Sequence, residues 1–161
     1  MIRQLHLNLF LKFRGHHEAA WNHPDSSPAL PTDVNFYVDI AQRAEAGLFD
    51  SIFFADSPVL TTDAPQSGRV GLEPITLLAA LAMATERIGL IATGTSTYSH
   101  AFNLARQFSS IDHISNGRAG WNIVTTWRKE VARNFGDAGQ NSHADRYVMA
   151  EEFVQVVKDL W

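Results

Sequence analysis

Four times along the chain, a short apolar run is followed by a polar loop and then by a helical pattern. The apolar runs begin near residues 5, 51, 88 and 119, at intervals that suit β-strand–α-helix units. Strands that alternate with helices and are themselves mostly apolar are typical of a parallel sheet covered by helices. The repetition therefore predicts an α/β fold, and the length of 161 residues predicts a single domain over residues 1–161.

Local signals place a helix after each predicted strand. Thr32 or Asp33 is a suitable cap for the first helix, and Pro74 occupies the first turn of the second. The sequence Ser-Asn-Gly at 115–117 ends the third, and the fourth spans about residues 144–161. Both an open doubly wound sheet and part of a (β/α) barrel fit this order of elements.

Polar residues at the strand ends favour the barrel. Asp56, Thr93 and Asn122 each lie at or near the carboxyl end of a different predicted strand. In (β/α) barrels this end of the strands carries the active site, which is built from the loops that follow them. The long loops of this chain also follow strands rather than helices, so we expect units of a TIM barrel.

The composition excludes several classes of protein. A net charge of −4 with only three lysines argues against a nucleic-acid partner. The absence of cysteine excludes disulfides and thiolate chemistry. The longest apolar run, residues 77–84, is too short to span a membrane, and the first residues lack a secretory signal, so we expect a cytoplasmic protein without a membrane partner. Neither a G-x-G-x-x-G dinucleotide fingerprint nor a G-x-S-x-G hydrolase motif is present.

Three histidines, His16, His17 and His23, lie in the loop after the first strand. They allow a metal site, but their nearest acidic neighbours are only Glu18 and Asp25. We therefore predict no metal and favour a loop that lines a polar pocket, where a neutral imidazole donates one hydrogen bond and accepts another.

Each strand-end residue has a structural alternative. Asp56 is equally suited to capping its own loop or contacting a ligand, and Thr93 is a good strand former in any case. An amide in an apolar run, such as Asn122, needs partners for both its donor and its acceptor, so a ligand and a structural partner are equally open there.

The segment before the last helix offers an anion site. His143 and Tyr147 are four residues apart and share a face if the helix has begun. Arg146 presents a fork of donors suited to phosphate, next to the free N–H groups of a helix N-terminus. The alternative is that Arg146 pairs with a surface acid such as Glu86, which would contribute little.

Several stretches resemble the bacterial luciferase-like flavin monooxygenases. Within that family the resemblance is to the branch of nitrilotriacetate monooxygenase component A, dibenzothiophene-sulfone monooxygenase and long-chain alkane monooxygenase. The longest stretch is DHISNGRAGWNIVTT at 112–126. The others are GHH at 15–17, WNHP at 21–24, FFAD at 53–56, ARNFG at 132–136, HADRY at 143–147 and AEEF at 150–153.

The resemblance implies a TIM barrel that uses reduced FMN and O2 to insert one oxygen atom into a small organic substrate. It also implies a separate NAD(P)H:flavin reductase as partner. His17 becomes the candidate catalytic residue, in a loop that the family places close to the substrate. The implied FMN contacts are Asp56, Thr93, Asn122, His143, Arg146 and Tyr147, with Arg146 near the phosphate.

Members of the family are more than twice as long as this chain, so four of eight barrel units are expected here. A half-barrel exposes its sheet edges and inner face, and self-association into a homodimer is the commonest remedy. Two hypotheses follow. The chain is the N-terminal half of a monooxygenase, inactive alone, or it is a non-catalytic flavin-binding or dimerisation module derived from that family.

Overall fold

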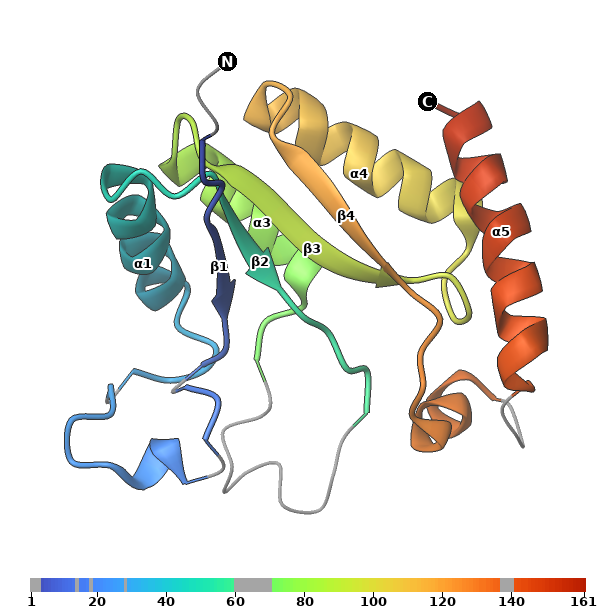
Figure 1. Cartoon of the computed structure of the whole chain (residues 1–161), viewed down its shortest axis with the longest axis horizontal. Helices are drawn as coiled ribbons and strands as arrows, with labels where there is room; N and C mark the ends of the chain where they lie inside the picture. Colours follow the sequence, from blue (N-terminus) through green and yellow to red (C-terminus); the bar gives the residue numbers. More distant parts are fainter. Residues whose placement is uncertain (1–3, 14, 18, 28, 60–70, 137–140) are drawn as a thin grey trace.

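The computed structural model describes residues 4–13, 15–17, 19–27, 29–59, 71–136 and 141–161. Four parallel strands form one sheet in the order β1-β2-β3-β4, so neighbours in the sequence are neighbours in space (Figure 1). The strands are β1 (Asn8–Leu11), β2 (Ser51–Phe54), β3 (Gly89–Thr95) and β4 (Ala119–Val124).

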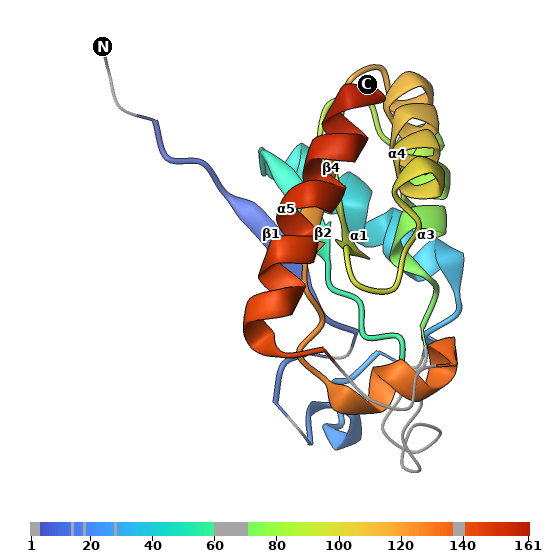
Figure 2. The same ribbon diagram turned by 90° about the vertical axis from the view of Figure 1, so that its right-hand side faces the viewer.

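Helices connect the strands and cover one face of the sheet, as the side view shows (Figure 2). They are α1 (Val34–Ala46), α3 (Pro74–Ala84), α4 (Ala101–Ser115) and α5 (His143–Asp159), with 3₁₀ helices η1 (Ala20–Asn22) and η2 (Lys129–Phe135) in the loops. Among the described residues, no helix combines the length and apolar character needed to cross a membrane.

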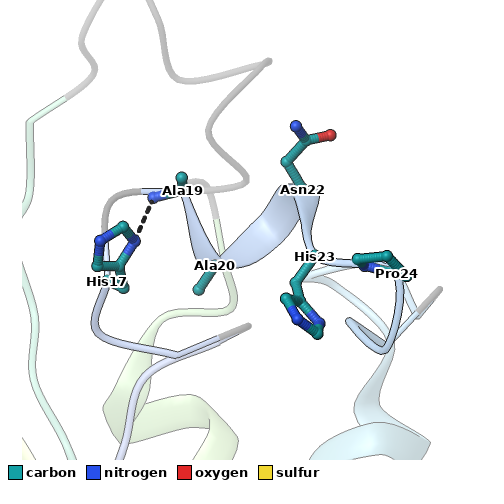
Figure 3. A pocket seen from close by; sticks show the side chains of 6 residues that line it. All are labelled: His17, Ala19, Ala20, Asn22, His23 and Pro24. Carbon is teal, nitrogen blue, oxygen red and sulfur yellow. Dashed lines mark hydrogen bonds between the residues drawn. The ribbon is translucent and has the colours of Figure 1, made fainter.

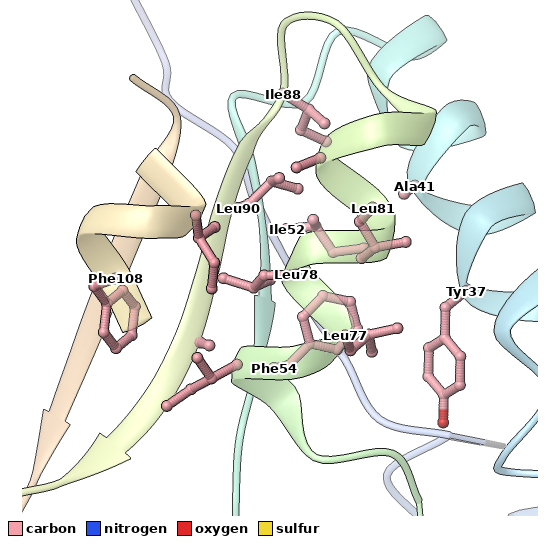
Figure 4. Close-up of a cluster of buried hydrophobic side chains, with 14 of the residues drawn as sticks. Tyr37, Ala41, Ile52, Phe54, Leu77, Leu78, Leu81, Ile88, Leu90 and Phe108 are labelled. Carbon is pink, nitrogen blue, oxygen red and sulfur yellow. The ribbon is translucent and has the colours of Figure 1, made fainter. Parts of the chain in front are cut away.

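The hydrophobic core lies between the sheet and these helices (Figure 4). Leu78 and Leu81 of α3 are completely buried against Ile52 of β2 and Leu90 of β3. Burying an aliphatic side chain of this size contributes about 1.5–3 kcal/mol. Helix α3 is therefore the element on which the sheet depends most, and Tyr37 of α1 extends the core at its edge.

The opposite face of the sheet carries an apolar layer. Side chains alternate between the two faces of a strand, so the residues between the core positions point away from the helices. Phe10, Phe53, Ile91 and Gly120 are register partners across the four strands. The rings of Phe10 and Phe53 lie 4.8 Å apart, and a Cβ on Gly120 would come within 3.0 Å of Ile91. Glycine thus lets this layer pack closely.

Two charged side chains tie the amino ends of the strands to the helices. The Glu45 carboxylate accepts hydrogen bonds from the backbone N–H groups of Glu86, Arg87 and Ile88. Desolvation works to raise the pKa of Glu45, but these hydrogen bonds outweigh it and hold the pKa below its ordinary value. The end of α1 is thereby fastened to the turn that enters β3.

Arg118, immediately before β4, uses all of its N–H donors. Its guanidinium donates to the carbonyl oxygens of Ala82, Thr85, Ile88 and Ser115 and to the Thr85 hydroxyl, at 2.7–3.0 Å. Three of these carbonyls come from the ends of α3 and α4, where no intrahelical donor is available. One side chain therefore caps two helices.

Most predicted boundaries are confirmed within two residues. Asp33 caps α1 through a 3.0 Å bond to the Asn35 N–H, and Glu73 caps α3 just before Pro74. Asn116, in the left-handed conformation, ends α4. The first strand is shorter than predicted, because the sheet begins at Asn8 and the preceding residues have no neighbouring strand.

Candidate functional site

All four strands point to the same end of the molecule, the lower edge in Figure 1. The loops that follow β1 and β4, with η1 and η2, lie beyond this edge. The loops that enter the strands are short and lie at the opposite end. Every candidate site residue therefore belongs to the end at which (β/α) proteins bind their ligands.

Thr93 and Asn122 form a pair on the inner face of the sheet. They are register partners on β3 and β4, and the Asn122 amide donates to the Thr93 hydroxyl over 3.0 Å. Thr93 is 4% exposed, whereas Asn122 is only partly buried. The pair stands one layer above Ile91 and Gly120, so a polar layer lies directly on the apolar one.

Sequence reasoning missed the hydroxyl groups above this pair. The Thr126 hydroxyl donates to the Thr95 hydroxyl over 2.7 Å, and the Thr97 hydroxyl donates to the carbonyl oxygen of Thr125 over 2.9 Å. Ser96 bonds to Val124 in the same way. Together they join the ends of β3 and β4. The dense run of hydroxyl residues at 93–97 after an apolar strand was the available signal.

Asp56 follows β2 at the same edge, where part of its surface is exposed to solvent and part is covered by the protein. Crowding by the surrounding protein desolvates the carboxylate and raises the pKa of Asp56 above its ordinary value. The backbone N–H of Ser57 works in the opposite direction, and the charge of Glu73 adds to the rise. The charged form of the carboxylate is thus disfavoured here relative to water.

The side chain of Ser142 caps the N-terminus of helix α5. The Ser142 hydroxyl accepts from the Asp145 N–H over 3.2 Å and donates to the Asp145 carboxylate over 2.6 Å. His143 and Tyr147 share a helix face as predicted, with their rings 4.8 Å apart, and both are exposed.

Arg146 lies on the other face of α5 and is buried, at 8% exposure. Its Nη1 donates to the carbonyl oxygen of Asn141 over 3.2 Å, and its buried Nε has no hydrogen-bond partner within the described part of the chain. The predicted alternative of an ion pair with Glu86 is wrong, because Glu86 lies beside Arg87 and no ion pair of Arg146 occurs among the described residues. A positive charge in the first turn of a helix is disfavoured by the helix dipole, and burial adds a desolvation cost. A bound anion would compensate for both effects.

The loop after β1 lines an open cavity of about 460 Å³. His17 and His23 line it on either side of η1 (Figure 3). The His17 Nδ1 accepts from the Ala19 N–H over 3.1 Å, so its ring N–H is on Nε2. No group of three His, Asp or Glu side chains in the described part of the chain could hold a metal ion. The remaining cavity walls are Ala19, Ala20, Asn22 and Pro24.

The arrangement suits a planar, polar ligand with an anionic tail. Thr93 and Asn122 offer a hydroxyl and an amide above an apolar layer, and the buried guanidinium of Arg146 offers a site for a phosphate. The structure joins Thr93 to Asn122 and His143 to Tyr147, and it places Asp56, Arg146 and His17 separately around the same edge of the sheet.

Comparison with known proteins identifies the family. The family model of the luciferase-like monooxygenases matches residues 10–161. The chain belongs to this family. The α/β architecture predicted from the sequence is thereby confirmed, since the four parallel βα units superpose on solved members of the family.

Relatives from the predicted branch cover the chain from end to end. It is 45% identical, over 99% of its length, to N-acetyl-S-(2-succino)cysteine monooxygenase from Bacillus subtilis (strain 168). It is 44% identical, again over 99% of its length, to nitrilotriacetate monooxygenase component A from Aminobacter aminovorans. The EDTA monooxygenase structure from Chelativorans sp. BNC1 is 37% identical, with a TM-score of 0.91 over 99% of this chain.

The matched region is only part of these proteins. The chain spans 36% of the Bacillus relative and 38% of the Aminobacter relative. It covers 37% of the EDTA monooxygenase chain. The four βα units therefore correspond to a minority of a whole luciferase-like monooxygenase.

Proposed function

We propose that the chain forms the flavin-binding N-terminal part of an FMNH2-dependent monooxygenase that inserts one oxygen atom from O2 into a small organic substrate. Family membership supports the reaction class, and the polar layer at the carboxyl ends of β3 and β4 supports a ligand there. Bound reduced FMN supplies the reaction with O2. The residues of this chain bind the flavin, orient it and exclude water.

The observation that carries the proposal is the guanidinium Nε of Arg146, which is buried and has no hydrogen-bond partner among the residues that the structure describes. A buried Arg Nε without an acceptor is costly, and a phosphate at the N-terminus of α5 would satisfy it. The residues present therefore fit FMN. Asp56, Thr93, Asn122, His143 and Tyr147 complete the proposed contacts, with His17 next to the substrate.

The test compares FMN with riboflavin, which lacks the phosphate. We expect Arg146→Ala to weaken binding of reduced FMN under anaerobic conditions at least ten-fold and to leave riboflavin binding almost unchanged. Flavin fluorescence after reoxidation measures both. Equal weakening of the two ligands would show that Arg146 is not a phosphate anchor. Lys158→Ala, at the other end of α5, is the matched control.

The proposed partners are a separate NAD(P)H:flavin reductase, which would deliver reduced FMN, and a second copy of the chain. In the described structure β1 pairs only with β2 and β4 only with β3, so both sheet edges keep free backbone groups. A symmetric dimer would cover these edges and the apolar layer around Phe10. Sedimentation equilibrium of the purified chain tests the second copy directly. We place the protein in the cytoplasm.

A non-catalytic flavin-binding or dimerisation module is the second candidate. The mass of the polypeptide in its native source separates the two. A longer product supports the monooxygenase, and a mature chain that ends at Trp161 supports the module.

A further inference from the structure

Among the described residues, three other than glycine adopt a positive φ: Leu48, Asn116 and Thr126. Leu48 follows the end of α1 and Asn116 ends α4, positions at which the left-handed conformation satisfies helix carbonyls. Thr126, with φ of 48°, follows a strand instead. A β-branched side chain is strained in this region, and such strain persists only where the surroundings impose it.

Side-chain hydrogen bonds impose the conformation of Thr126. Its hydroxyl donates to the Thr95 hydroxyl, and the neighbouring Thr125 carbonyl accepts from Thr97. Thr95 lies two residues beyond Thr93 on the same strand, and therefore on the same inner face. The strained residue is thus tied to the layer directly above the Thr93–Asn122 pair.

The next residue is an exposed tryptophan. The side chain of Trp127 is 80% exposed, although indole is among the most costly groups to leave in water. The guanidinium of Arg128 lies 5.7 Å from its ring centroid, a cation–π contact that favours one orientation of the ring. An aromatic side chain that is both restrained and exposed is preorganised for contact, because little conformational entropy remains to be lost on binding.

We propose that Thr126 is a positioning residue, whose strained backbone holds Trp127 as a fixed aromatic wall of the substrate site. The substrate then presents an apolar or aromatic face to this wall. The inference rests on the proposed function for the identity of the site, since Trp127 follows the strand that carries Asn122. It assigns to the β4 loop a role in selecting the substrate.

The test uses 5-fluorotryptophan labelling and ¹⁹F NMR of the full chain. Trp127→Phe identifies the resonance of Trp127 by its disappearance. We expect one narrow resonance in the wild type, and in Thr126→Gly a resonance shifted towards that of the free amino acid. Leu48→Gly is the matched control, because it relieves the same kind of backbone strain far from the site. Both glycine variants should keep or raise the Tm, and only Thr126→Gly should release Trp127.

Dibenzothiophene sulfone serves as the aromatic probe and nitrilotriacetate as the non-aromatic one. We expect the sulfone to shift the Trp127 resonance saturably, with a Kd at least five-fold weaker in Thr126→Gly, and nitrilotriacetate to leave it unchanged. The proposal is overturned if Thr126→Gly retains the wild-type resonance, or if the sulfone does not shift it. A shift that depends on protein concentration alone would overturn it in favour of a chain–chain contact.

Flavin binding is measured in the same samples by fluorescence. If FMN fails to bind while the sulfone still shifts Trp127, the proposed function fails and the aromatic wall stands. If FMN binds and Trp127 does not respond, the proposed function stands and the aromatic wall fails.

Discussion

The charged groups at the two ends of the sheet differ in their hydrogen bonding and in the direction of their pKa shifts. At the amino ends, Glu45 and Arg118 are saturated with hydrogen bonds, and the pKa of Glu45 is lowered. At the carboxyl ends the pKa of Asp56 is raised, the Arg146 Nε lacks a partner among the described residues, and Thr126 is strained. The first end stabilises the fold. The second carries unsatisfied groups whose cost a ligand can offset, as expected where stability and function are separated.

The largest expected loss of stability comes from a substitution at the amino ends of the strands. Arg118→Ala removes five hydrogen bonds and leaves helix-terminal carbonyl oxygens without donors. We expect a loss of about 3 kcal/mol or more in the free energy of unfolding, measured by urea denaturation. Arg87→Ala is the control. Its guanidinium makes an exposed contact with Glu86 at 3.5 Å, so its loss should stay below about 0.5 kcal/mol. Similar losses in both variants would contradict the capping role of Arg118.

The second effect depends on pH. Glu45→Gln should lower the free energy of unfolding by about 1–2 kcal/mol at pH 7, because a charged acceptor of backbone N–H groups is lost. The folded-state pKa of Glu45 lies below its ordinary value of 4.5. The stabilisation is therefore complete above that value and is lost as the pH falls through the folded-state pKa.

Urea denaturation at pH 7 and at pH 3 checks this sign. The difference between the wild type and Glu45→Gln should shrink at the lower pH. Glu152→Gln, on the exposed side of α5, should show little difference at either pH. If the difference in free energy of unfolding between the wild type and Glu45→Gln stays constant with pH, the carboxylate charge of Glu45 contributes nothing to stability.

The smallest effect has the opposite sign and tests the carboxyl end. Asp56→Asn removes a carboxylate whose raised pKa makes its charged form unfavourable in the fold. The contribution of Asp56 to the free energy of unfolding is greatest below its ordinary pKa of 3.8. It falls as the pH rises through the raised pKa of the folded state. At pH 7 we expect a small rise in Tm and a smaller stabilisation by FMN.

Asp112→Asn is the corresponding substitution at the amino ends of the strands. The Asp112 carboxylate accepts from the Ala119 N–H over 3.3 Å, so its replacement should lower the Tm. Differential scanning calorimetry of both variants, with and without FMN, measures the four values. A fall in Tm for Asp56→Asn would place Asp56 with the stabilising groups.

Local signals made the helices predictable. A cap such as Asp33 or Glu73 acts on N–H groups two or three residues away, and the proline at 74 sets the backbone of the first helical turn. The 3₁₀ helix η2 was not predicted, because it depends on burial of Val131 and Ala132 against distant parts of the chain. The shortened β1 likewise depends on where its neighbour β2 begins.

The sequence by itself determined the α/β class, the family and the edge of the sheet at which the candidate site residues lie. Periodicity, caps and motifs depend on residues that are close together in the sequence, so they can be recognised without a structure. Only the tertiary structure decided that Asn122 bonds to Thr93, 29 residues away, and that Thr126 bonds to Thr95, 31 residues away. It also decided that Arg146 faces inward while Tyr147 faces solvent. Such pairs depend on strand register and helix rotation, which packing of the whole core sets, and a one-residue slip in either would separate them.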